Sequence, residues 1–293
     1  MEIRNLISFK KIAELRSFSK AAVELGYSQS TVTMQIKQLE SELQVNLFDR
    51  IGKTIRLTNE GNDFLCYASE IISIAENARQ VMSKDTVPKG ELIIGLMESV
   101  CTAYLPQILN EFHTAYPGVN TIIKIGTYQE LSNMLNTNSI DILWVFDTPI
   151  ETKEWSRVFT YESDISVICS PQNELASRTK VNLSDIILEP FILTEQNCSY
   201  RTIFENTIFS LGLKPNVFLE IGNTEIIKKF VASNLGISVL PMFTVIDELK
   251  SNRLSQINLS EFSLTMQGQL FVHKNKWLTP GLNSFIDVVK KII

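Results

Sequence analysis

The feature that most constrains this 293-residue sequence is a pair of short helical patterns at residues 17–43, SFSKAAVELGYSQSTVTMQIKQLESEL. Ser19 is expected to cap a first short helix, which buries its two alanines and Leu25. Gly26 then supplies the permissive backbone that a tight turn needs. A second helix follows at once, so the segment is predicted to form a helix-turn-helix.

The second helix separates its apolar residues from its polar ones. Val32, Ile36, Leu39 and Leu43 share the face that is expected to be buried. Short hydroxyl and amide side chains at the start of a helix suit the base edges and phosphates of a DNA major groove. A plain helical hairpin with a polar exposed face would show the same spacing. The candidate DNA-contacting residues of this segment are Ser28, Gln29, Ser30, Thr31, Thr33 and Lys37.

A short basic segment, LFDRIGKTIRLTNEG, comes directly after the second helix. Gly52 stands at the bend of a hairpin-like pattern, with Arg50, Lys53 and Arg56 around it. These cations favour contacts with DNA phosphates, as in a wing, although a solvated surface would also accept them. Residues 1–58 hold nine Lys/Arg against six Asp/Glu, a net +3, whereas the whole chain has a net charge of −5. The basic end is therefore where DNA is expected to bind.

One long amphipathic helix is expected from about residue 58 to 83. Apolar residues along it alternate spacings of four and three, which is typical of a two-stranded coiled coil. The stripe predicts a dimerisation helix or, alternatively, a helix packed on its own domain. Pro88 and Gly90 then begin a linker, so we expect a DNA-binding domain at 1–58 and a linker helix at 59–87. The stripe consists of Phe64, Ala68, Ile71, Ala75, Ala78 and Met82.

After residue 90, apolar β-branched runs alternate with helical segments, which is typical of an α/β fold. Continuous apolar runs such as DILWVF favour parallel strands covered on both faces, with ligands at the carboxyl ends of the strands. Trp144 and Phe146 in that run are candidates for a pocket lining, but aromatic residues on a buried strand are more often core, so both are interpreted as core residues. The expected strands are 92–96, 121–125, 140–146, 165–169, 191–194, 217–221 and 237–240.

Composition and spacing argue against several other classes of protein. No apolar run approaches the roughly 20 residues of a membrane span, and the charged N-terminus differs from a signal peptide, so a cytoplasmic protein without membrane contact is expected. Four scattered cysteines predict reduced thiols, and neither a metal site nor a cofactor is expected. Two histidines, without triad spacing or a phosphate loop, argue against an enzyme. A solute-binding protein would need an export signal and would leave residues 1–83 unexplained.

The whole chain resembles the LysR-type transcriptional regulators. The residues that carry the resemblance are Phe18, Ala21, Ala22, Leu25, Ser28, Gln29, Ser30, Thr33, Ile36, Leu39, Glu40, Leu47, Phe48, Arg50, Leu57, Thr58 and Gly61. The resemblance implies a winged helix-turn-helix that binds promoter DNA, a linker-helix dimer, and an effector domain like a type 2 periplasmic binding protein, commonly in a homotetramer. Met34 departs from the pattern, because many relatives carry a polar or basic residue there. We expect an altered operator sequence rather than lost DNA binding.

The same resemblance divides the effector domain, 88–293, into two α/β subdomains. The first covers about 91–162 together with 266–293, and the second covers about 163–265. A small-molecule effector is expected in the cleft between them, where several strand ends meet helix starts. Free amides at helix starts attract anions, so the effector is expected to be anionic.

Two of the residues near this cleft also have explanations that need no ligand. Arg201 would favour an anion unless it pairs with Glu205. Thr127 and Glu130 have the spacing of a capping box, which accounts for both residues. The candidate effector-binding residues are Glu98, Ser99, Val100, Thr127, Tyr128, Thr194, Asn197, Cys198, Ser199 and Asn223.

Cys198 also permits an alternative, a regulator that senses redox state through a thiol. A thiol at a helix start is acidified and therefore reactive, and peroxide-sensing relatives keep their reactive cysteine at this position. Those relatives carry a second cysteine further along, where this chain has Thr207, Ile208 and Phe209. An internal disulfide switch is therefore disfavoured.

Overall fold

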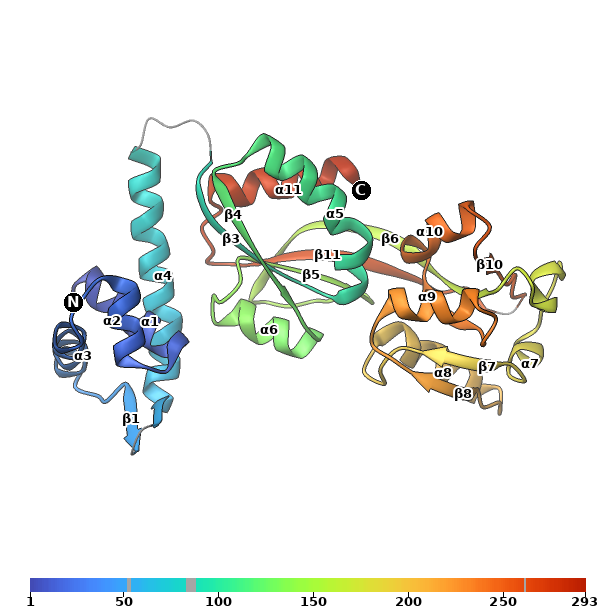
Figure 1. Cartoon of the computed structure of the whole chain (residues 1–293), viewed down its shortest axis with the longest axis horizontal. Helices are drawn as coiled ribbons and strands as arrows, with labels where there is room; N and C mark the ends of the chain where they lie inside the picture. Colours follow the sequence, from blue (N-terminus) through green and yellow to red (C-terminus); the bar gives the residue numbers. More distant parts are fainter. Residues whose placement is uncertain (52–53, 83–87, 261) are drawn as a thin grey trace.

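The computed structural model describes residues 1–51, 54–82, 88–260 and 262–293. A small N-terminal domain comes first, followed by one long helix and then two α/β lobes (Figure 1). No helix in the described ranges has both the length and the apolar character to cross a membrane.

The N-terminal domain is a helix-turn-helix followed by a hairpin. Its helices are α1 (Ile3–Leu15), α2 (Phe18–Leu25) and α3 (Gln29–Leu43), and the antiparallel strands β1 (Phe48–Ile51) and β2 (Thr54–Leu57) form the predicted wing. Gly26 ends α2 with a φ of 69°, as the predicted turn requires.

The predicted cap of α2 was wrong. The hydroxyl of Ser17 accepts a hydrogen bond from the amide of Lys20, whereas Ser19 already lies inside the helix. The helix begins at Phe18 because the buried Phe18 ring anchors its first turn in the core.

The long helix α4 (Asn59–Met82) packs its first half on the N-terminal domain. Ala68 and Ile72 are buried in that core, and the Phe64 ring lies 5.3 Å from the Phe9 ring, centroid to centroid. The first half of α4 therefore packs on its own domain, which was the alternative to a dimerisation helix. Further along, Ile74 and Ala78 are exposed, and the side chain of Met82 is outside the described residues.

The first lobe is a mixed sheet with helices on both faces. Its strand order is β6-β11-β5-β3-β4, with β3 (Gly90–Leu96), β4 (Val119–Ile125), β5 (Ile142–Asp147), β6 (Trp155–Cys169) and β11 (Thr265–His273). Only β3 with β4 and β3 with β5 are parallel, because β11 runs antiparallel to both of its neighbours. The prediction of parallel strands was thus right for β3, β4 and β5 in this lobe and wrong for the end of β6, which runs antiparallel to its neighbours.

Strand β5 is covered on both faces, as its apolar run predicted. Trp144 and Phe146 belong to the core shared with α5 (Glu98–Ala115) and α11 (Pro280–Ile292). Leu143 and Val145 point to the opposite face and pack with α6 (Tyr128–Asn136). Alternate residues of one strand therefore serve two separate cores.

The second lobe is joined to the first by β6 and β11 (Figure 1). The last part of β6 pairs with β9 (Ser238–Pro241) and β10 (Ser255–Gln256), and β7 (Pro190–Leu193) runs parallel to β8 (Asn216–Glu220). The helices of this lobe are α7 (Leu183–Ile186), α8 (Ser199–Ser210), α9 (Thr224–Ala232) and α10 (Met242–Lys250).

Candidate DNA-binding surface and ligand pocket

Helix α3 is fixed by its cap and by its apolar face. The hydroxyl of Ser28 accepts a hydrogen bond from the amide of Thr31 at 3.1 Å, which satisfies one free amide of the first turn. Val32, Ile36 and Leu39 are fully buried. With this face held in the core, the opposite face of α3 is turned outward.

The outward face of α3 gathers the predicted DNA-contacting residues. Gln29, Ser30, Thr33 and Lys37 line one shallow groove together with Met34, which is 66% exposed. Ser28 and Thr31 lie at the start of the same helix and are engaged in its cap. The outward face of α3 thus offers amide, hydroxyl and ammonium groups, and Met34 adds one exposed apolar side chain to it.

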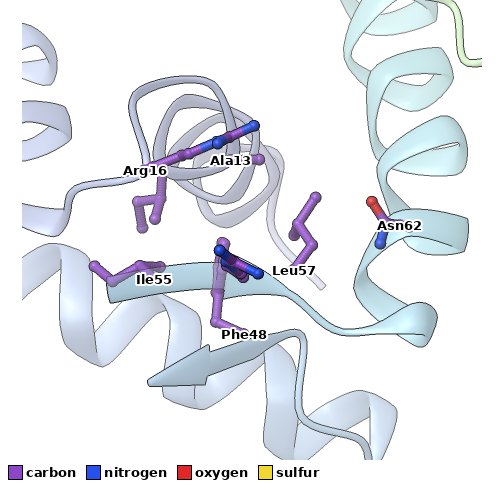
Figure 2. Close-up of a pocket in the computed structure, with 8 residues that line it drawn as sticks. Ala13, Arg16, Phe48, Ile55, Leu57 and Asn62 are labelled. Atoms are coloured by element: carbon purple, nitrogen blue, oxygen red, sulfur yellow. The ribbon is translucent and has the colours of Figure 1, made fainter. Parts of the chain in front are cut away.

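The wing carries one described cation, Arg56, which lines a pocket together with the end of α1. Arg56 is exposed and stands opposite Asp49 in the register of the two strands. The side chain of Arg50 and all of Lys53 lie outside the described residues. The pocket that the wing covers has a volume of about 340 Å³, and Figure 2 shows Arg16 from the end of α1 and Asn62 from α4 on either side of it.

A second pocket, of about 270 Å³, lies where the two lobes meet. The ends of β3, β4, β5 and β7 reach it, and the starts of α5, α6 and α8 face it. It is lined by the predicted residues Glu98, Ser99, Thr127, Tyr128, Thr194, Asn197, Cys198 and Ser199. Adjacent strand ends and helix starts thus bring together side chains that are far apart in the sequence.

Two of the predicted effector-binding residues do not line this pocket. Val100 is fully buried in the core of the first lobe, because it faces inward from the first turn of α5. Asn223 caps α9, where its side-chain oxygen accepts a hydrogen bond from the amide of Ile226 at 2.9 Å. Its neighbour Gly222 lines the pocket instead.

Several lining residues were not predicted from the sequence. Glu195 lies in the loop after β7, two residues before the predicted Asn197. The end of that strand was therefore a signal for Glu195 as well. Phe146 is both buried core and pocket wall, which the interpretation as core alone missed. The unpredicted lining residues are Met97, Ile125, Gly126, Glu130, Phe146, Glu195, Tyr200 and Gly222.

Direct hydrogen bonds cross from one lobe to the other at this pocket. The hydroxyl of Ser199 donates to a carboxylate oxygen of Asp147 at 2.6 Å. The Glu98 carboxylate accepts from the amide of Thr224 at 3.2 Å and from its hydroxyl at 3.0 Å. Burial raises the pKa of Glu98, and the bonds from Thr224 oppose that rise.

Thr127 and Glu130 form a complete capping box at the start of α6. The Glu130 carboxylate accepts from the Thr127 amide at 2.9 Å and from its hydroxyl at 2.8 Å. These hydrogen bonds lower the pKa of Glu130. Capping thus occurs at the pocket wall, and both residues also line the pocket.

The guanidinium of Arg201 forms hydrogen bonds within its own lobe. It is buried, donates to Glu205 at 3.0 Å and to Glu220 at 2.8 Å, and also donates to the Thr194 carbonyl. It does not line the pocket. The reading of Arg201 as an anchor for an anion was therefore wrong, and the alternative of a pair with Glu205 holds.

Cys198 occupies the predicted position directly before α8, as a free thiol. Burial raises the pKa of this thiol, which is opposite to the expected acidification. The side chain makes no capping hydrogen bond to the helix start. The site therefore offers little support for a reactive thiolate at neutral pH.

Comparison with known proteins identifies both parts of the chain. The model of the bacterial regulatory helix-turn-helix protein, lysR family, matches residues 3–62, and that of the LysR substrate binding domain matches residues 85–292. The HTH-type transcriptional regulator YwqM of Bacillus subtilis is 36% identical over 99% of both chains. The regulator GltR of the same organism is 30% identical over 98% of this chain and 95% of its own.

Solved structures share the same fold. A variant of full-length OxyR from Pseudomonas aeruginosa gives a TM-score of 0.79 at 18% identity, covering 99% of this chain and 95% of its own. Full-length CbnR complexed with its target DNA gives a TM-score of 0.64 at 20% identity, covering 100% of both chains. The families and relatives are transcriptional regulators and not enzymes. The chain belongs to the LysR family of bacterial transcriptional regulators.

Proposed function

We propose that this regulator binds promoter DNA through α3 and the wing and is switched by a small molecule held between its two lobes. The observation that carries the proposal is the pocket between the lobes. Two direct hydrogen bonds span it, one donated by Thr224 to Glu98 and one donated by Ser199 to Asp147. A ligand there would contact both lobes and so change their relative position.

The DNA contacts are assigned to the polar face of α3 and to the cations of the wing. Amide and hydroxyl groups at a helix start read base edges, and arginine and lysine contact phosphates. The assigned residues are Ser28, Gln29, Ser30, Thr31, Thr33 and Lys37 on α3, with Arg50, Lys53 and Arg56 on the wing.

We assign effector binding to the lining residues at the strand ends, and we place an anionic group of the effector at the start of α8. The first amides of a helix lack partners within the helix and attract negative charge. Cys198 makes no capping bond there and the Asn197 side chain offers a further donor, whereas the hydroxyl of Ser199 already donates to Asp147. The other assigned contacts are Glu98, Ser99, Thr127, Tyr128 and Thr194.

The assembly we propose is a dimer of dimers acting in the cytoplasm, with 1–58 binding DNA, 59–87 pairing subunits and 88–293 sensing the effector. The exposed Ile74 and Ala78 on α4 support a pairing surface. Effector binding would change how the effector domains meet, and hence the spacing of DNA-binding heads on successive half-sites.

A bending experiment tests the coupling between pocket and DNA. Thr224→Val and Ser199→Ala together remove the hydroxyl donors to Glu98 and Asp147. On circularly permuted DNA from upstream of the chain's own gene, this variant should bind with a bend angle or footprint length different from wild type. Gln107→Ala, on the exposed face of α5, should leave both unchanged. Identical bends and footprints in all three proteins would contradict the proposal.

A further inference from the structure

The pocket between the lobes carries three carboxylates and no positive side chain among its described lining residues. Glu98 comes from the first lobe, Glu195 from the second, and Glu130 from the start of α6. None of them takes part in a salt bridge within the described ranges. The lining residues of the pocket therefore carry a net negative charge.

The three carboxylates differ in the hydrogen bonds that they accept from the protein. Glu130 is engaged in the capping box with Thr127. Glu98 accepts hydrogen bonds from Thr224, which are neutral donors and leave its charge unbalanced. Glu195 has neither a hydrogen bond nor an ion pair among the described residues, and its carboxylate lies against Gly222, where a β-carbon would stand 2.9 Å from Oε2. The Glu195 side chain is exposed, and its carboxylate is free to accept hydrogen bonds from a ligand.

Glu98 and Glu195 line the same pocket from opposite lobes. The charge of Glu195 adds to burial in raising the pKa of Glu98. Two like charges facing each other across a closing cleft repel, and they do so more strongly as water leaves. A positive group between them would remove that repulsion and favour the closed arrangement.

Apolar and aromatic side chains complete the same pocket. Met97, Ile125 and Phe146 line it, with Ile125 57% exposed, and Tyr128 is a further lining residue. Such a surface suits the hydrocarbon part of an organic molecule, and an aromatic ring also attracts a cation. In the described part of the chain, no three acidic, cysteine or histidine side chains are arranged to hold a metal ion.

We propose that the effector carries a protonated amine, which binds between Glu98 and Glu195 with its hydrocarbon part against Met97, Ile125 and Phe146. This inference rests on the proposed function and names the class of its ligand. Combined with an anionic group at the start of α8, it describes a small zwitterion of the amino-acid type. The ammonium group donates charge-assisted hydrogen bonds to the two carboxylates.

Calorimetric titration of the full chain tests this inference with matched probes. The probes are the L-amino acids, each with its decarboxylated amine and its deaminated acid, at concentrations up to about 10 mM. At least one amine-bearing probe should bind, and its deaminated counterpart should bind about ten-fold more weakly or not at all. Glu195→Gln should weaken the amine-bearing probe by a similar factor. Glu91→Gln, which changes an exposed carboxylate at the start of β3, should leave the affinity unchanged.

Three results would overturn the inference: no amine-bearing probe binds, a deaminated acid binds as tightly as its amine, or Glu195→Gln leaves the amine's affinity intact. Displacement of the amine by magnesium chloride alone, at matched ionic strength, would also reject it in favour of a metal site. Failure of the proposed function would look different. In that case an amine would bind, yet the footprint and bend on DNA would not respond to it.

Discussion

The carboxylate of Glu40 accepts hydrogen bonds from the backbone amides of Leu47 and Phe48, at 2.9 and 3.3 Å. Both of these residues are buried, so their amides have little access to water. The bonds join the last part of α3 to the first strand of the wing. One side chain therefore sets the position of the wing relative to α3, the helix that we propose contacts DNA.

Removing that carboxylate should loosen the wing. Glu40→Ala leaves two amides without a partner, and an unsatisfied buried donor costs about 1–3 kcal/mol. Glu40→Gln keeps one oxygen acceptor and should cost less. Hydrogen exchange at Leu47 and Phe48 measures this directly, and it should be fastest in Glu40→Ala. Equal exchange in Glu40→Ala and wild type would show that the two amides are held by other contacts.

Gly61 should tolerate a side chain less well than Gly26. A β-carbon at Gly61 would stand 2.2 Å from the carbonyl oxygen of Leu47, which is fixed backbone, whereas one at Gly26 would meet nothing within 4 Å. Gly26→Ala should cost only the backbone strain of its φ of 69°, about 1 kcal/mol. Gly61→Ala should cost more. Urea unfolding of the two variants, followed by a probe in the N-terminal domain, gives the order, and a larger loss for Gly26→Ala would refute the packing argument.

Local patterns predicted the DNA-binding domain well because its contacts are close in sequence. The apolar spacing of Val32, Ile36 and Leu39 and the turn at Gly26 were sufficient to outline α2 and α3. The cap was misplaced by two residues because Ser17 and Ser19 are equivalent candidates until the burial of Phe18 decides between them. Such a choice depends on tertiary packing.

The effector domain was harder to predict because its sheet joins distant segments. Strand β11 and the first part of β6 contain many polar residues, so neither shows the continuous apolar run by which the other strands were found. The helix starts indicated eight of the residues that line the pocket, but they gave no indication of Glu195. Arg201 has no sequence pattern that separates an ion pair with Glu205 and Glu220 from a ligand contact.

Arg56 should contribute to DNA affinity through phosphate and not through base sequence. Arg56→Ala should weaken binding to all DNA sequences about equally and reduce the slope of log affinity against log salt by about one. Arg178→Ala, at an exposed position in the second lobe, is the matched control and should leave the slope unchanged. Fluorescence anisotropy over a salt series measures both. An unchanged slope for Arg56→Ala would remove this residue from the DNA contacts.

Peroxide should not act through Cys198. Burial raises the pKa of this thiol, so little of the reactive thiolate is present at neutral pH. Wild type and Cys198→Ser should bind DNA with equal affinity, and peroxide should change neither. A peroxide effect on wild type that Cys198→Ser abolishes would restore the redox-sensing alternative.

DNase footprinting of the full chain on the DNA upstream of its own gene, over a salt series, tests the central claim most directly. Wild type should give saturable protection that weakens with rising salt. Gln29→Ala should lose about ten-fold or more in affinity, the effect of losing one bidentate base contact, while Gln107→Ala should match wild type. Absence of protection at low salt on this and neighbouring promoters, or equal protection by Gln29→Ala, would contradict the assignment of α3 as the helix that reads DNA.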